Sequence, residues 1–87
     1  MNYSIEFTRN ALKDYELVKK SPYSKKVKKL LFILESDPFK PPLEALTGNM
    51  QGLYSRRITK EHRLVYEVNK EKQTIKIRSM WTHYENV

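Results

Sequence analysis

The residues best suited to chemistry lie in the stretch Tyr54–Tyr66 and in the pair His83-Tyr84 near the end of the chain. The stretch reads Y-S-R-R-I-T-K-E-H-R-L-V-Y and carries three arginines on two short segments with alternating apolar residues. A guanidinium held on a sheet can bind a phosphate through two parallel hydrogen bonds. A histidine is the side chain that most readily moves a proton near neutral pH. A phosphate clamp with a proton donor is the minimum set of groups for cleaving RNA.

Strand alternation determines where the arginines point. Successive strand residues face opposite sides of a sheet, so Arg56 and Arg57 should point in opposite directions. A hairpin loop over residues 59–61 would bring Arg57 and Arg63 to one face, where they could bind a phosphate together. The alternative is that these arginines are solvated, or paired with Glu61 or Glu67, as surface charges ordinarily are. The spacing alone leaves both interpretations open.

Further residues could complete such a site. Trp81 and Tyr84 flank His83, and aromatic side chains together with arginines commonly hold unstacked RNA bases. Both aromatic residues could instead pack the end of the last strand, and a terminal histidine is often only an exposed residue. Glu44 is the only acidic residue of the irregular stretch 38–52. It could act as a general base, which typically contributes about 10²- to 10⁴-fold in rate, or it could simply be solvated.

Composition favours a small basic protein that forms one domain over residues 1–87. Seventeen Lys and Arg residues against ten Asp and Glu give a net charge of +7. This charge favours a polyanionic partner, whether nucleic acid, an anionic membrane or an acidic protein. With no cysteine and two histidines, a metal site is not expected, and neither is a cofactor. There is no long apolar run and no signal-peptide pattern, so we expect a cytoplasmic protein without a membrane partner.

The hydrophobic pattern predicts an α+β domain in which one strand and two helices precede three strands. The order β-α-α-β-β-β suggests a small antiparallel sheet with the two N-terminal helices on one face. Thr8 is the expected N-cap of the first helix, and the lysines between Lys19 and Lys29 should form the polar face of the second helix and its approach. His62 is expected to be structural, as a hydrogen-bond anchor of the hairpin. The predicted strands are 3–7, 53–58, 62–69 and 74–81, and the predicted helices end near residues 20 and 35.

The run P-L-E-A-L-T-G-N-M-Q-G-L-Y-S-R-R-I-T-K-E-H-R-L-V-Y, followed by a terminal H-Y, resembles the YoeB/Txe toxins. These are the toxin halves of bacterial type II toxin–antitoxin modules, within the wider RelE-like group. The resemblance covers essentially the whole chain, and the predicted order of elements matches the RelE-like fold.

The resemblance implies a ribonuclease that cuts messenger RNA, typically within the ribosomal A site. By resemblance, Glu44 is the general base that takes the proton from the ribose 2′-hydroxyl, and Arg63 stabilises the pentavalent phosphorane. His83 matches the general acid that protonates the 5′-oxygen, and Tyr84 matches the aromatic residue beside the scissile phosphate. The expected product carries a 2′,3′-cyclic phosphate, and no metal takes part.

The phosphate-binding residues follow the family pattern with one departure. Arg57 matches a second arginine that contacts the phosphate, and we expect Arg56 beside it to contribute to phosphate binding. The family usually has a lysine at the position of Thr47, so one cation is missing here. The sequence K-P-P-L-E also replaces the family's usual approach to the base, and residues 85–87 extend past the tyrosine at which relatives tend to end.

The family also implies partners. These are an acidic antitoxin of the YefM/Axe type, the ribosome with its mRNA, and in many relatives a second copy of the toxin, which would make a homodimer. Two alternatives remain open on the sequence. The chain could be a non-catalytic basic module that binds RNA or the ribosome, or a degenerate toxin that acts mainly in a repressor complex with its antitoxin.

Overall fold

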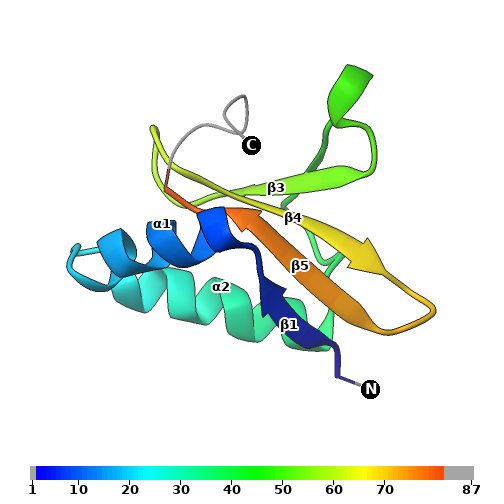
Figure 1. The fold of residues 1–87 in the computed structure, drawn as a ribbon, viewed down its shortest axis with the longest axis horizontal. Coiled ribbons are helices and arrows are strands. Elements are labelled where there is room, and N and C mark those ends of the chain that lie inside the picture. Colours follow the sequence, from blue (N-terminus) through cyan, green and yellow to red (C-terminus); the bar gives the residue numbers. More distant parts are fainter. Residues whose placement is uncertain (1, 82–87) are drawn as a thin grey trace.

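A computed structural model of the chain describes residues 2–81. Two helices and five strands follow one another in the order β1, α1, α2, β2, β3, β4, β5, with a short 3-10 turn between β2 and β3 (Figure 1). Their bounds are β1 Ser4–Phe7, α1 Arg9–Lys19, α2 Ser24–Ser36, β2 Glu44–Ala45, the 3-10 turn Gly48–Met50, β3 Leu53–Arg57, β4 Arg63–Asn69 and β5 Thr74–Ser79.

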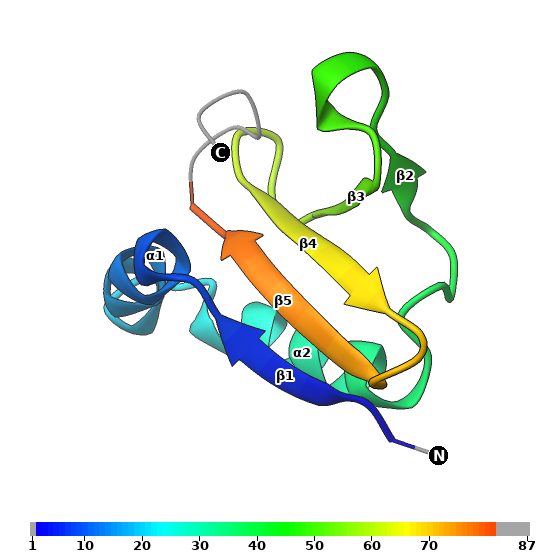
Figure 2. The same ribbon diagram turned by 45° about the vertical axis from the view of Figure 1, so that its right-hand side comes forward.

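The strands form one sheet in the order β1-β5-β4-β3-β2, and Figure 2 shows β5 lying between β1 and β4. The predicted α+β class with two helices on one face is confirmed, with two differences. First, β1 pairs parallel to β5, so the sheet is mixed rather than fully antiparallel. Parallel neighbours need a long crossover, and everything between β1 and β5 supplies it here. Second, the predicted loop 38–52 contains β2, which pairs antiparallel with β3.

The helices form where their apolar stripes and caps predict them. Thr8 caps α1, since its hydroxyl accepts the N–H of Ala11 at 3.1 Å. The apolar stripes of both helices pack on the same face of β4 and β5, and burial of this apolar surface is the main stabilising contribution. The fully buried members of this core are Ala11, Val18, Val27, Leu34, Leu64, Tyr66, Ile75, Ile77 and Met80, each 0% exposed.

Asp14 is a carboxylate within the buried stripe of α1, between Ala11 and Val18. It is 7% exposed, and its Oδ2 accepts the backbone N–H of Met80 at 3.1 Å. A buried N–H left without a partner is costly, so this single contact ties α1 to the chain just beyond β5. The sequence pattern contains a signal for it, namely an acidic residue at a position that should be apolar.

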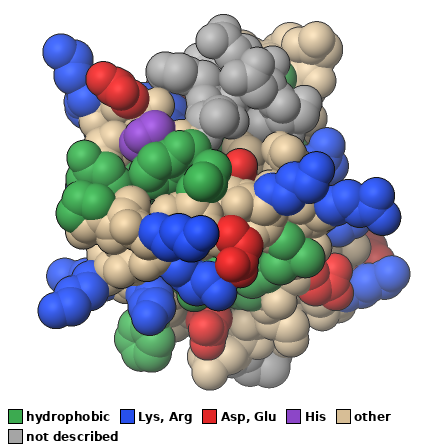
Figure 3. All heavy atoms as spheres, turned by 60° about the vertical axis from the view of Figure 1, so that its left-hand side comes forward, with side chains coloured by type: hydrophobic (Ala, Val, Ile, Leu, Met, Phe, Trp, Pro, Cys, Tyr) green, Lys and Arg blue, Asp and Glu red, His purple; other side chains and the backbone are tan. Residues whose placement is uncertain are grey.

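The lysines of α2 lie on its outer side, as predicted, and Lys25, Lys26, Lys28 and Lys29 are all exposed. Viewed from the end of the molecule that carries the α1–α2 turn, Figure 3 shows Lys and Arg side chains spread over the surface among acidic and hydrophobic ones. Neither helix of the part that the structure describes is long and apolar enough to cross a membrane.

The contact between Asp14 and Met80 predicts a large stability effect. Asp14→Ala should lower the free energy of unfolding by about 1–3 kcal/mol, because the Met80 N–H stays buried without an acceptor. Glu16→Ala, an exposed acidic residue of the same helix, should change it by no more than about 0.5 kcal/mol. Urea denaturation followed by circular dichroism measures both. Equal effects of the two substitutions would contradict the assignment.

Candidate active site

The β3–β4 hairpin places Arg57 directly opposite Arg63. Cross-strand partners point to the same face of a sheet, so both side chains share one face, as the alternation predicts. Since Leu64 points into the helix-covered core, Arg63 lies on the opposite side, here called the open face. The hydroxyl of Thr59 closes the hairpin loop by accepting the N–H groups of Glu61 and His62, each at 3.1 Å.

Glu44 reaches the same face through β2. It lies opposite Ser55 of β3, and this pairing directs its side chain to the open face beside Ser55. The hydroxyl of Ser55 in turn accepts a hydrogen bond from Nη1 of Arg63 at 3.1 Å. Ser55 therefore stands between the carboxylate and the guanidinium and orients Arg63, a role that the sequence did not reveal.

A groove of about 350 Å³ joins these groups. Glu44, Ser55, Arg57 and Arg63 line it together with Arg56, and apolar side chains of α2 and residues 41–43 complete its wall. The structure thus brings together four of the site residues that the sequence predicted, Glu44, Arg56, Arg57 and Arg63, of which Arg56 is buried. His83 and Tyr84 lie outside the described residues.

Two of the three arginines that line the groove, Arg57 and Arg63, are not neutralised by carboxylates. Glu67, the partner considered from the sequence, lies 3.7 Å from Lys76 Nζ and 3.9 Å from Arg78 Nη1 instead. Among residues 2–81, neither Arg57 nor Arg63 forms an ion pair. Their positive charge is therefore available to an anionic ligand.

Arg56, which the sequence analysis expected to contribute to phosphate binding, differs from Arg57 and Arg63 in its placement. It points away from the open face, is 3% exposed, and its guanidinium donates to the backbone carbonyls of Lys40 and Pro42. Alternation along β3 explains this placement, since Arg57 occupies the open face. Arg56 therefore holds the segment that leads into Glu44, while its side chain also forms part of the groove wall.

Tyr66 anchors the same segment from β4. Its buried hydroxyl donates to the carbonyl of Pro38 at 2.7 Å. Burial raises the pKa of Tyr66 above its ordinary value of 10.0, although Arg56 acts in the opposite direction. The hydroxyl consequently keeps its proton, and with it this hydrogen bond, across the neutral range.

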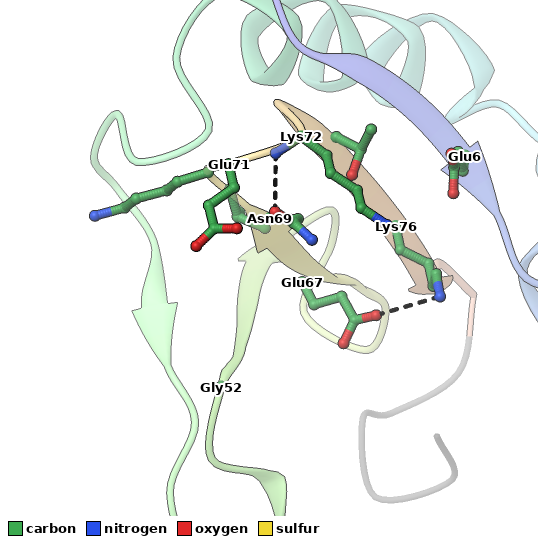
Figure 4. Close-up of a pocket in the computed structure, with 10 residues that line it drawn as sticks. Glu6, Gly52, Glu67, Asn69, Glu71, Lys72 and Lys76 are labelled. Carbon is green, nitrogen blue, oxygen red and sulfur yellow. Dashed lines mark hydrogen bonds and ion pairs between the residues drawn. The ribbon is translucent and has the colours of Figure 1, made fainter.

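A larger hollow lies elsewhere on the sheet, near the β4–β5 turn, and measures about 670 Å³ (Figure 4). Both lysines and glutamates line it, and the ion pair between Lys76 and Glu67 lies on its wall (Figure 4). Its charged lining residues are Glu6, Glu67, Glu71, Lys70, Lys72 and Lys76. With three carboxylates against three ammonium groups, this hollow has no net attraction for phosphate, unlike the arginine groove.

Comparison with known proteins decides the family. Residues 7–84 match the family model of the YoeB-like toxin of bacterial type II toxin-antitoxin systems. Toxin YoeB of Mycobacterium bovis is 33% identical over 78 residues, covering 83% of this chain and 89% of that protein. The chain belongs to the YoeB toxin family. The family that the sequence motif suggested is thereby confirmed.

Solved YoeB structures share the fold as well. The YoeB/ParE toxin from Agrobacterium tumefaciens has a TM-score of 0.85 at 32% identity, covering 93% of this chain and 99% of that one. YoeB from Staphylococcus aureus is 35% identical, and the comparison covers 97% of this chain and 100% of that one. Its structures are a dimer, with a TM-score of 0.81, and a YoeB–YefM complex, with a TM-score of 0.79. The chain is thus a YoeB-type toxin with the RelE-like α+β fold.

Substitutions of the neighbouring residues Arg56 and Arg57 in this YoeB-family site should affect stability differently. Arg56→Ala should lower the free energy of unfolding by at least about 2 kcal/mol, because a buried side chain and its hydrogen bonds to two backbone carbonyls are lost. Arg57→Ala should leave it within about 0.5 kcal/mol, because that side chain is exposed. Thermal and urea unfolding measure both variants. A large loss for Arg57→Ala with none for Arg56→Ala would reverse the two assignments.

Proposed function

We propose that this YoeB-family toxin is an endoribonuclease that cleaves mRNA, with the groove lined by Glu44, Arg57 and Arg63 as its active site. The observation that supports the proposal most is the shared groove of Glu44, Arg57 and Arg63, in which a carboxylate faces the same space as two guanidiniums that form no ion pair among the described residues. A base next to phosphate-binding cations is the arrangement that attack by a ribose 2′-hydroxyl requires.

The proposed reaction is an in-line displacement at phosphorus. Glu44 removes the proton of the 2′-hydroxyl, whose oxygen forms a bond to phosphorus while the bond to the 5′-oxygen breaks. Arg63 and Arg57 stabilise the negative charge that builds up on the equatorial oxygens. In the assignment carried by the family pattern, His83 donates a proton to the leaving 5′-oxygen. The products are a 2′,3′-cyclic phosphate and a 5′-hydroxyl.

Tyr84 and Ser55 have supporting roles in this proposal. Tyr84, by the family pattern, lies beside the scissile phosphate. Ser55 holds Arg63 through the 3.1 Å hydrogen bond, so that its guanidinium needs little reorganisation when the phosphate arrives. None of these steps needs a metal or a cofactor.

The partners proposed for this chain follow from its relatives and its charge. YoeB of Staphylococcus aureus forms a complex with YefM and also occurs as a dimer. We propose that this chain binds a corresponding antitoxin, acidic enough to match its +7 charge. We also propose that it forms a homodimer like that of the Staphylococcus aureus toxin. The ribosome with its mRNA is the proposed substrate complex, which places the action in the cytoplasm.

Removing either proton carrier should abolish most of the activity. Glu44→Gln and His83→Ala should each lower the cleavage rate of translated mRNA by at least about 10²-fold, the usual contribution of a general base or acid. Glu16→Gln, which removes an exposed carboxylate on α1, should cleave like the unmodified toxin. Primer extension on a defined mRNA in a reconstituted translation reaction measures the rates, and cosedimentation measures ribosome binding.

The outcomes separate the proposed activity from its alternatives. Cleavage that survives both substitutions would refute the acid–base assignment. An unmodified toxin that binds ribosomes without cutting mRNA would identify a binding module instead. Binding of the antitoxin and its operator, without ribosome binding or cleavage, would identify a toxin that acts only in repression.

A further inference from the structure

His62 lies at the junction between the arginine hairpin and the end of β5. Its backbone carbonyl accepts the N–H groups of Ile58 at 2.9 Å and Thr59 at 3.0 Å, which closes the β3–β4 turn. The next residue in the chain is Arg63. The backbone of His62 is thus part of the turn that sets Arg57 and Arg63 opposite each other.

The ring of His62 makes a second connection. It stacks on Trp81 with ring centroids 4.1 Å apart and an angle of 17° between the planes. Tyr23 flanks both rings, at 6.3 Å from His62 and 6.4 Å from Trp81. Nδ1 of His62 also forms a hydrogen bond with the carbonyl oxygen of Trp81. A carbonyl can only accept, so Nδ1 is the donor and carries the proton.

The two described residues that follow Ser79 of β5, Met80 and Trp81, are therefore each held by a side chain. Asp14 of α1 binds the N–H of Met80, and His62 of the hairpin binds the carbonyl of Trp81. In sequence, Trp81 precedes His83 by two positions. The side chain of His62 thus connects the hairpin that carries Arg57 and Arg63 to the segment that leads to His83, the proposed acid.

We propose that His62 is a positioning residue for proton donation by His83, acting through its hydrogen bond to the Trp81 carbonyl. This inference rests on the proposed function. The physical reason is that a displacement of about 1 Å in a catalytic group can cost about 10²-fold in rate, even when the altered residue touches no substrate. The hydrogen bond fixes Trp81, two positions before His83 in the sequence, to the hairpin that carries the arginines.

Two near-isosteric variants isolate the hydrogen bond from the rest of the ring. The amide nitrogen of asparagine lies near the position of Nδ1, so His62→Asn can still donate to Trp81, whereas His62→Gln places its amide near Nε2. Both lose the aromatic stack, so any loss of stability is shared. Each is tested as the full chain, beside His62→Ala and His83→Ala, on translating ribosomes that carry a short mRNA.

The scissile linkage of this mRNA is used in two forms, natural and with sulfur in place of the bridging 5′-oxygen. An ordinary thiol has a pKa of about 8.5, so a thiolate leaves without the proton that an alkoxide needs. On natural RNA, His62→Gln and His62→Ala should lower the single-turnover rate roughly 10- to 100-fold, with half-saturation within about twofold, while His62→Asn stays within about threefold of the unmodified toxin. On the sulfur-substituted RNA, the three His62 variants and His83→Ala should all cleave within about threefold of the unmodified toxin.

The two substrates distinguish failure of this inference from failure of the proposed function. If sulfur restores His83→Ala but not His62→Gln, or if His62→Asn and His62→Gln are equally slow on natural RNA, the positioning role is refuted while the acid assignment stands. If sulfur does not restore His83→Ala, the acid assignment itself fails and the inference falls with it. Should His62→Ala unfold at the assay temperature, the Asn and Gln variants still decide the outcome.

Discussion

The pairing of Arg57 with Arg63 across β3 and β4 is the constraint on which the site depends. Like charges directly opposite each other destabilise a sheet, and among the described residues no carboxylate pairs with either arginine. When a protein retains a locally unfavourable arrangement such as this repulsion between two arginines, the arrangement commonly lies at a functional site. The conflict would be relieved by an anion bound between the two guanidiniums, which is what the proposed phosphate substrate provides.

The other half of the groove depends on buried polar contacts rather than on regular structure. Arg56 and Tyr66 hold the segment before Glu44. Arg56 donates hydrogen bonds to the carbonyls of Lys40 and Pro42, and Tyr66 donates one to the carbonyl of Pro38. Only the two residues of β2 then pair with β3, which is enough to set Glu44 opposite Ser55. The base is thus positioned by the same strand that carries Arg57, so a change in β3 register would displace both groups together.

Much of this arrangement could be predicted from the sequence, for identifiable reasons. Alternation along β3 and β4 predicted that Arg57 and Arg63 share a face and that Arg56 points away, because that property depends only on the period of a strand. The N-cap at Thr8 was predictable because capping is local. The role of Asp14 was not, since its partner Met80 is 66 positions away. The parallel pairing of β1 with β5 is likewise set by tertiary packing, and a two-residue strand such as β2 is too short to show a period.

The central claim is that the groove of Glu44, Arg57 and Arg63 directs a ribose 2′-hydroxyl against the neighbouring phosphorus. The chemical nature of the new RNA ends tests this most directly, because only attack by the 2′-oxygen closes a ring on the phosphate. Mass spectrometry of the fragments from a defined mRNA should find a 2′,3′-cyclic phosphate on one fragment and a 5′-hydroxyl on the other. A 3′-hydroxyl with a 5′-phosphate would mean that water or another nucleophile attacks, and would contradict the account.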